Sequence, residues 1–168
     1  MRLIIAAALA ATMLTACSEP EPVDQAPTYD ARQYSSAIYD IARSDDDRAA
    51  DATRMPGELL AFAQIDKGEV VVDYIMGGGY MTRLLAMAVG SNGKVYAFQP
   101  DEFIAMRAEY ASDQDEAVAP YADEEGNPVR VFPVRGPIAE PGFAEPLDTI
   151  ITAMNFHDLF LPCPRACS

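Results

Sequence analysis

A run of β-branched residues followed by three consecutive glycines is the feature of this sequence best suited to ligand binding. Glu69 to Ile75 reads EVVVDYI, as expected of a strand buried on both faces of a parallel sheet. Gly77, Gly78 and Gly79 come next, and a helical pattern begins directly after them. Glycine lets the main chain turn sharply and approach a ligand, because it has no Cβ atom. A strand, a glycine turn and a helix in this order predict backbone N–H groups close to a bound ligand.

A short polar stretch late in the chain provides side chains that could take part in catalysis. The apolar run Leu147–Met154 (LDTIITAM) predicts a buried strand, and Asn155, Phe156, His157 and Asp158 follow it directly. The carboxyl ends of parallel strands are where such sheets bind ligands. His157 is the only histidine, and it could act as a general base or orient a substrate, with Asp158 fixing its tautomer. Asn155 and His157 are the catalytic candidates; the alternative for both is a capping or packing role.

The positions after the glycines argue against a nicotinamide-dinucleotide site. That fingerprint has a third glycine three residues after the second, where this chain has Thr82. It also places an acid at the end of the second strand, which is predicted here over Lys94–Phe98 (KVYAF), and Gln99 stands at that position. A nicotinamide enzyme is therefore a disfavoured alternative.

Helical periodicity predicts the elements that must position these residues. A first helix is expected over residues 29–44, with an apolar face made of Ala37, Ile38, Ile41 and Ala42. A second helix is expected to begin at Ser44, because serine caps helices and the acids of Asp45–Asp47 suit the helix dipole. A short third helix opens at Pro56 and is expected to bury Leu59, Leu60 and Phe62. The helix after the glycines has an inner face made of Leu84, Leu85, Ala88 and Val89. A third strand is expected over Val129–Val134.

Length and charge limit the classes of protein to which the chain can belong. Its 168 residues suffice for one domain, and 50% of them are hydrophobic, an ordinary globular balance. Twelve basic and 26 acidic side chains give a formal charge of −14. A surface this acidic repels phosphate backbones, so nucleic acid is not expected as a partner. A metal site is not expected either, because there is one histidine and the run Asp45–Asp47 lacks the glycine and glutamate of a calcium loop.

Residues 1–17 have the layout of a secretory signal. The apolar run Leu3–Leu14 is too short to span a bilayer, and the residues LTAC that end at Cys17 resemble a bacterial lipobox. Lipidation of Cys17 would anchor the chain to a membrane; the alternative is a signal with an incidental cysteine. Ser18 after the cysteine favours the outer membrane of a bacterial cell envelope, on its periplasmic side. Residues 18–28 (SEPEPVDQAPT) predict a flexible acidic tether rich in proline.

Three stretches of the sequence carry a resemblance to known proteins. They are Arg54–Leu60 (RMPGELL), the segment VVDYIMGGGYMTRLLA and the segment GKVYAFQPDEF. Together with Asn155–Asp158, they resemble the class I S-adenosylmethionine-dependent methyltransferases. Within this family the chain is most similar to a group of exported bacterial methyltransferases that share a DxxxGGGY motif, here Asp73 to Tyr80, and a later asparagine-aromatic-His-Asp stretch. The resemblance covers about residues 45–162.

The resemblance implies S-adenosylmethionine as the cofactor and methyl transfer to an unidentified small-molecule or protein acceptor. The residues that it implies for cofactor binding are Asp73, Gly77, Gly78, Gly79, Tyr80 and Gln99. Gln99 stands where the family usually has an acid for the ribose hydroxyls, so a weaker grip is expected, with Asp101 as the substitute. Arg135 similarly follows the third strand, where an acid would hold the adenine.

The fold that the resemblance implies is an α/β, Rossmann-like, three-layer αβα methyltransferase core. The family's strand order is 3-2-1-4-5-7-6, and this sequence supplies only the first four strands, so a partial domain with the order 3-2-1-4 is expected over residues 29–162. Residues 163–168 form an atypical tail, which is expected to result from a truncation or a shifted reading frame. The alternative is that Cys163 and Cys167 form a redox or metal pair. The leading expectation is a truncated S-adenosylmethionine-dependent methyltransferase, whose activity the sequence leaves open. The alternative is a non-catalytic cell-envelope lipoprotein, a binding or interaction module that keeps the Rossmann-like scaffold.

Overall fold

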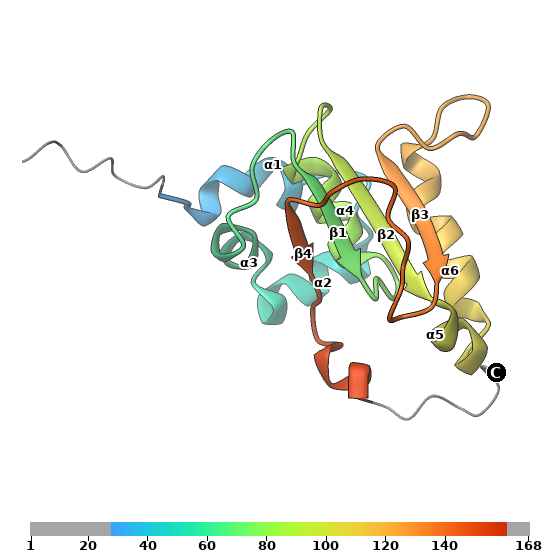
Figure 1. Ribbon diagram of the computed structural model, residues 1–168. Helices are drawn as coiled ribbons and strands as arrows, with labels where there is room; N and C mark the ends of the chain where they lie inside the picture. The colour runs from blue at the N-terminus through green and yellow to red at the C-terminus, as the bar shows by residue number, and fades with distance from the viewer. Residues whose placement is uncertain (1–27, 161–168) are drawn as a thin grey trace, which may run out of the picture.

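Four parallel strands form the sheet at the centre of the computed structural model, which describes residues 28–160 (Figure 1). The β-branched run forms β1 (Val70–Tyr74), and its neighbour on one side is β2 (Lys94–Pro100). β3 (Val131–Gly136) pairs with β2, and β4 (Thr149–Ile151) pairs with the other side of β1. The predicted α/β class and the strand order 3-2-1-4 are therefore confirmed.

All four predicted strands have different limits in the structure: β1 is one residue shorter at each end, and β2 runs two residues further, to Pro100. β3 begins at Val131, two residues later than predicted, and β4 comprises three residues of the longer apolar run. Within the described residues β4 lies at the edge of the sheet, and its Ile150 side chain is largely exposed. Ile75, directly after β1, and Met154, three residues after β4, both adopt positive φ angles (66° and 68°).

Helices precede β1 and connect β1 to β2 and β2 to β3, whereas an irregular segment connects β3 to β4. The helices are η1 (Ala31–Tyr34), α1 (Ser35–Ile38), α2 (Asp45–Arg54), α3 (Pro56–Phe62), α4 (Tyr80–Ala88), α5 (Asp101–Met106), α6 (Glu109–Val118), η2 (Ala119–Tyr121) and η3 (Phe156–Phe160). No helix among residues 28–160 is long and apolar enough to cross a bilayer. The predicted signal with Cys17, the tether up to residue 27, and the pair Cys163 and Cys167 lie outside the described residues.

The first predicted helix is much shorter than expected. Of residues 29–44, only η1 and α1 are helical, and the chain leaves the helix after Ile38. The buried Arg43 guanidinium folds back and donates a hydrogen bond to the Ile38 carbonyl oxygen at 2.6 Å, which replaces the next helical turn. Ile41 is consequently 96% exposed, so its predicted place on the apolar face is wrong, whereas Ala37 is fully buried as predicted.

The junction between α2 and α3 follows the sequence signals. The Ser44 hydroxyl oxygen caps α2 by accepting a hydrogen bond from the Asp47 N–H at 3.1 Å. Met55 ends α2 in a left-handed conformation (φ 43°), and Pro56 then starts α3 at the position where proline is best tolerated. Within α3, Leu60 is fully buried, but Phe62 is 86% exposed, so the predicted burial of Phe62 is wrong, and nothing in the structure explains its exposure.

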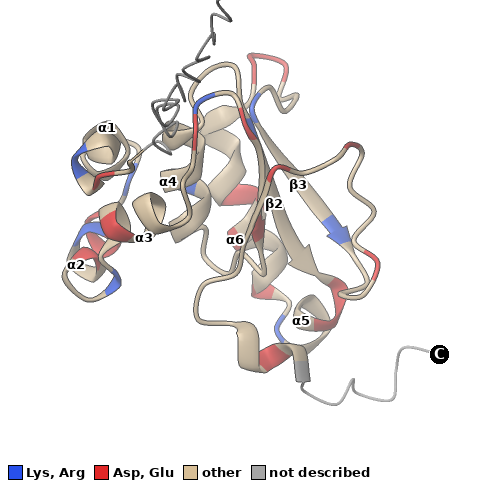
Figure 2. Cartoon of the chain, turned by 60° about the vertical axis from the view of Figure 1, so that its left-hand side comes forward, with Lys and Arg blue, Asp and Glu red and all other residues tan. Residues whose placement is uncertain are grey.

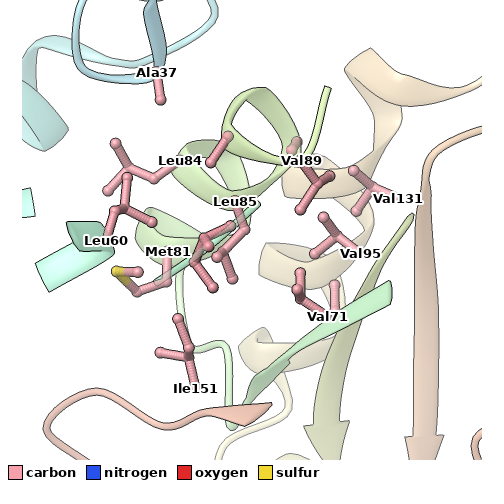
Figure 3. Close-up of a cluster of buried hydrophobic side chains, with 14 of the residues drawn as sticks. Ala37, Leu60, Val71, Met81, Leu84, Leu85, Val89, Val95, Val131 and Ile151 are labelled. Carbon is pink, nitrogen blue, oxygen red and sulfur yellow. The ribbon is translucent and has the colours of Figure 1, made fainter. Parts of the chain in front are cut away.

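α4 and α6 pack on one face of the sheet, α1 packs against α4, and α3 packs against η1 and α1. Figure 3 shows Leu84 and Leu85 of α4 between Leu60 of α3 and the strand residues Val71 and Val95. All of these side chains are fully buried, as is Val89, and Ala88, the other predicted inner-face residue, is buried as well. The apolar face of α4 therefore holds this helix on the sheet. The glycine loop that precedes α4 is positioned by the same packing.

The other face is covered by the irregular segment between β3 and β4, residues 137–148, which crosses in front of β1 and β2 in Figure 1. Phe143 packs on Tyr96 and Phe98, with ring centroids 5.6 and 5.8 Å apart. The Glu145 carboxylate accepts hydrogen bonds from the Lys94 ammonium at 2.6 Å and from the Tyr96 hydroxyl at 2.8 Å. A loop with one aromatic anchor thus completes the core on this side.

Candidate functional site

A cavity of about 550 Å³ lies at the carboxyl ends of β1 and β4, beside α2. Its walls are formed by Asp46, Asp47, Ala50, Arg54, Asp73, Ile75, Met76, Gly77, Gly78, Tyr80, Met81, Ala153, Met154, Asn155, His157 and Asp158. This size lies within the range of small-molecule sites, which is roughly 300–1,000 Å³. The carboxyl ends of parallel strands are also where α/β sheets bind ligands, so position and size agree.

The three glycines after β1 differ in what surrounds them. A Cβ atom added to Gly77 or Gly78 would meet no other atom within 4 Å, and both residues line the cavity. A Cβ added to Gly79 would come within 2.5 Å of the Ala117 Cβ atom on α6, and Gly79 has a φ of 79°. Packing and backbone conformation thus require Gly79, whereas Gly77 and Gly78 leave the main chain open to the cavity.

Gln99 holds the glycine loop from beneath. Its side chain is fully buried within β2, and its Oε1 atom accepts a hydrogen bond from the Gly77 N–H at 3.1 Å. Its Nε2 atom is buried and has no hydrogen-bond partner within residues 28–160. Gln99 is not among the residues that line the cavity, so its contact with a ribose stays a prediction, and the structure gives it a loop-supporting contact that the sequence did not indicate.

Asp73 lies at the end of β1, on the face that is covered by helices. Its side chain is buried, and its carboxylate accepts a hydrogen bond from the Thr82 hydroxyl on α4 at 2.6 Å. Burial raises the pKa of Asp73 to about 6, although the Thr82 hydrogen bonds and the nearby Arg83 charge favour the ionised form. The same Thr82 that replaces a dinucleotide glycine therefore fixes the orientation of the carboxyl group.

A bidentate ion pair ties α2 to the glycine loop. The Arg83 guanidinium donates to both Asp47 carboxylate oxygens, at 2.6 and 2.8 Å, and its Nη2 atom also donates to the Gly78 carbonyl oxygen at 3.0 Å. Asp47 and Arg83 are both largely buried. Sequence reasoning missed this pair, although Arg83 follows Gly79 by one helical turn and Asp47 stands in the first turn of a capped helix.

Tyr80 belongs to a second set of contacts between α2 and α4. Figure 2 shows that α2 carries both acidic and basic residues. Its hydroxyl donates to an Asp51 carboxylate oxygen at 2.8 Å, and the buried Arg43 guanidinium donates to the same carboxylate. These two partners, Arg43 first, lower the pKa of Asp51, while burial and the Asp51 hydrogen bond raise the pKa of Tyr80. The Arg54 guanidinium lies over the Tyr80 ring, 4.4 Å from its centroid.

The polar stretch after β4 reaches the same cavity. The Asn155 side-chain Nδ2 donates to the Ile75 carbonyl oxygen at 2.8 Å, which joins the loop after β4 to the loop after β1. The His157 side chain is 77% exposed, and its Nε2 atom lies 3.2 Å from an Asp158 carboxylate oxygen. Asn155 therefore connects the two loops, and the exposed His157 side chain is accessible to a ligand.

The structure brings most of the predicted site residues together. Asp73, Gly77, Gly78, Tyr80, Asn155 and His157 line one cavity. Gly79 and Gln99 do not line it, and Arg135 instead donates hydrogen bonds to Gln114, Ala111 and Asp115 on α6. Within residues 28–160 no cluster of side chains could hold a metal ion.

Comparison with solved structures points to one class of protein. A SAM-dependent methyltransferase from Aquifex aeolicus is 25% identical to this chain, with a TM-score of 0.50 over 70% of this chain and 57% of that protein. A SAM-dependent O-methyltransferase from Thermotoga maritima matches at 26% identity with a TM-score of 0.38, over 60% of this chain and 34% of that one. A protein-L-isoaspartate O-methyltransferase matches at 20% identity and 0.39, over 58% and 28%.

The similarity to the Aquifex protein supports the assignment of the fold class. The described chain is a partial methyltransferase-type core, a four-stranded parallel sheet with helices, and it spans 57% of the length of that protein. No model of a known protein family matches the sequence. The exported subgroup with its DxxxGGGY motif therefore stays a prediction.

Proposed function

We propose that the chain binds S-adenosylmethionine at the glycine loop and serves methyl transfer to an unidentified small-molecule or protein acceptor. The observation that carries this proposal is the open space beside Gly77 and Gly78 in the cavity at the ends of β1 and β4. The similarity to the SAM-dependent methyltransferase from Aquifex aeolicus supports this choice of ligand.

The residues of the cavity fit such a cofactor. S-adenosylmethionine supplies a methyl group bound to a positively charged sulfur, next to an ammonium group. Asp46 and Asp158 line the cavity without an arginine partner among the described residues, so they favour a cationic ligand. Gly77 and Gly78 allow the backbone to approach the ligand closely, and Gln99 holds the Gly77 N–H in place beneath it. Arg83 orients the Gly78 carbonyl group.

Residues of the chain then orient the acceptor and accept its proton. Methyl transfer from a sulfonium depends chiefly on the orientation of the acceptor, which residues in fixed positions can provide. Asn155 fixes the loop after β4 against the loop after β1. His157, exposed at the cavity wall and oriented by Asp158, is the proposed group that takes a proton from the acceptor or orients it.

Calorimetric titration of the full chain with S-adenosylhomocysteine tests cofactor binding. We expect saturable binding to the wild type and no binding to Gly78→Val, because that side chain would occupy the space beside the loop. Gly136→Ala, at the end of β3, is the matched control, since its added Cβ makes only ordinary contacts and is remote from the cavity. A folded chain that gives no heat contradicts cofactor binding and favours a non-catalytic module that keeps the scaffold.

The proposed cellular setting is the bacterial cell envelope, with lipidated Cys17 as the anchor and residues 18–28 as the spacer. This proposal depends on the lipobox-like residues before Cys17. Metabolic labelling with a radioactive fatty acid in a bacterial host tests it. We expect label in the wild type and none in Cys17→Ser; equal labelling of both chains contradicts the anchor.

A further inference from the structure

A second, smaller cavity adjoins the candidate cofactor site. Its volume is about 190 Å³, and Arg54, Tyr80, Met81, Ala153 and Met154 line both cavities. Leu59 of α3 closes its far side. A molecule in this side cavity would therefore lie next to anything that is bound at the glycine loop.

The side cavity suits an apolar group. Its walls are mainly Leu59, Met81, Ala153, Met154 and the Tyr80 ring. An apolar cavity of roughly 150 Å³ is large enough for a benzene ring, so this one has room for an aromatic ring or a branched alkyl group. Methionine side chains adapt to the shape of a ligand, which favours binding of more than one such group.

Arg54 provides a positive charge at the junction of the two cavities. Its guanidinium lies over the Tyr80 ring and forms no ion pair in the described part of the chain. Six other arginines do have a carboxylate partner there: Arg32, Arg43, Arg48, Arg83, Arg107 and Arg135. In a chain with a formal charge of −14, an arginine left without an acidic partner beside a cavity is available to an anionic ligand.

The two cavities differ in their charged residues, although Arg54 lines both. Asp46, Asp47, Asp73 and Asp158 line the larger cavity, and none of them lines the smaller one. Arg54 is the one charged residue of the smaller cavity. The larger cavity therefore favours a cationic ligand, and the smaller one favours a ligand that combines an apolar body with a negative charge.

We infer that the side cavity is the acceptor site, and that the acceptor carries an apolar group the size of an aromatic ring next to an anionic group that Arg54 binds. This inference rests on the proposed function, which supplies the neighbouring cofactor site. It adds the chemical class of the acceptor, which neither the sequence nor the similar structures indicate.

Three probes of nearly equal size and different charge test the inference: benzoate, benzamide and benzylamine, with acetate as an anion without an apolar body. Binding to the full chain is followed by NMR chemical-shift changes, with and without S-adenosylhomocysteine. We expect benzoate to bind about tenfold more tightly than benzamide, the size of effect expected for a charge-assisted hydrogen bond, and acetate and benzylamine to bind most weakly. Benzoate binding should persist when the other cavity is filled.

Two pairs of variants locate the binding. Arg54→Gln should reduce benzoate affinity to that of benzamide, whereas Arg130→Gln should leave it unchanged, because Arg130 also lies over a tyrosine ring but lines neither cavity. Leu59→Trp should fill the side cavity and exclude both benzoate and benzamide. Phe62→Trp, an exposed position of the same helix, should not.

Several results overturn the inference. They are equal or tighter binding of benzylamine, an unchanged benzoate affinity in Arg54→Gln, and displacement of benzoate by S-adenosylhomocysteine, which would assign Arg54 to the cofactor site. If S-adenosylhomocysteine does not bind but the ranking of probes holds, the proposed function fails and the anion-binding cavity stands. If S-adenosylhomocysteine binds and the ranking is absent, only the acceptor site is wrong. If nothing binds, both are wrong.

Discussion

Gly77, Gly78 and Gly79 are adjacent in sequence but are needed for different physical reasons. Gly77 and Gly78 border open space, whereas an added Cβ at Gly79 would meet Ala117 on α6. Gly78 also lacks the positive φ angle of its two neighbours, so a larger residue there causes no backbone strain. Stability and ligand binding can therefore be separated within one tripeptide.

Alanine substitutions at these glycines should show this separation. We expect Gly79→Ala to lower the free energy of unfolding by about 2 kcal/mol or more, from the left-handed backbone and the contact with Ala117. Gly78→Ala should leave it nearly unchanged, because its Cβ has space. Urea unfolding followed by circular dichroism measures both. Equal losses in the two variants would show that Gly78 is also a packing position.

The buried Asp73 carboxyl should make stability depend on pH. Its pKa is about 6 in the folded chain and 3.8 for the free side chain, so between these values the folded chain retains a proton that the unfolded chain releases. The contribution of Asp73 to stability is therefore full below pH 4 and is lost as the pH rises through 6. At 1.36 kcal/mol per pKa unit, the loss is on the order of 3 kcal/mol.

Asp73→Asn removes this ionisation and can still accept the Thr82 hydrogen bond. Between pH 4 and pH 7, we expect the free energy of unfolding of the variant to fall less than that of the wild type, by up to about 3 kcal/mol. Chemical unfolding at four or five pH values provides the comparison, and other titrating groups cancel in the difference. Parallel curves for the two proteins would mean that Asp73 ionises normally when folded.

At the scale of elements, α2 is held against α4 by an ion pair and a hydrogen bond that single-sequence patterns do not indicate. The Asp47–Arg83 pair is largely buried, and breaking a buried pair by removing one charge costs several kcal/mol. The Asp45–Arg48 pair on the same helix is exposed, and such pairs contribute little. The two pairs allow a matched comparison within one helix.

Asp47→Asn should destabilise the chain by about 3 kcal/mol, because the largely buried Arg83 charge would lose its carboxylate partner and keep only neutral acceptors, such as the Gly78 carbonyl oxygen. Asp45→Asn should have no measurable effect. Thermal unfolding of both variants next to the wild type is the measurement. If Asp47→Asn unfolds at the wild-type temperature, α2 is not held to the glycine loop through Arg83.

The strands were more predictable from sequence than the amino-terminal helices. β1 and α4 follow from an uninterrupted β-branched run and from an apolar face with helical spacing, both of which reflect burial directly. The helix expected over residues 29–44 has the right spacing as well, but the Arg43 side chain bonds to the Ile38 carbonyl oxygen and ends it early. A hydrogen bond between a side chain and a backbone carbonyl group five residues earlier leaves no periodic pattern in the sequence, so periodicity could not reveal it.

At the scale of the whole molecule, the sheet has two unlike faces. Helices cover one face, and residues 137–148 cover the other through Phe143. Phe143→Ala should therefore lower the free energy of unfolding by about 2 kcal/mol, because it removes a partly buried ring and its contacts with the Tyr96 and Phe98 rings. Phe62→Ala, at an exposed position, should not. An unaffected Phe143→Ala chain would show that the segment does not stabilise the sheet.

Part of the candidate site could be predicted from the sequence because the parallel sheet determines where the strands end. Residues after β1 and β4 converge because parallel neighbouring strands end at the same edge, so the glycine loop, Asn155 and His157 could be placed together from sequence. Arg54, Asp47 and the orientation of Gln99 could not, because they depend on how α2 packs and on which way a buried side chain turns.

The central claim is that the glycine loop holds the cofactor. The most direct test is an NMR titration of the isotope-labelled full chain with S-adenosylhomocysteine, read at the backbone amides. We predict saturable shifts at Gly77, Gly78 and Asn155, which line the cavity, and none along β3, which lies at the far edge of the sheet. Shifts confined to other parts of the chain, or no shifts in a folded protein, would contradict the account.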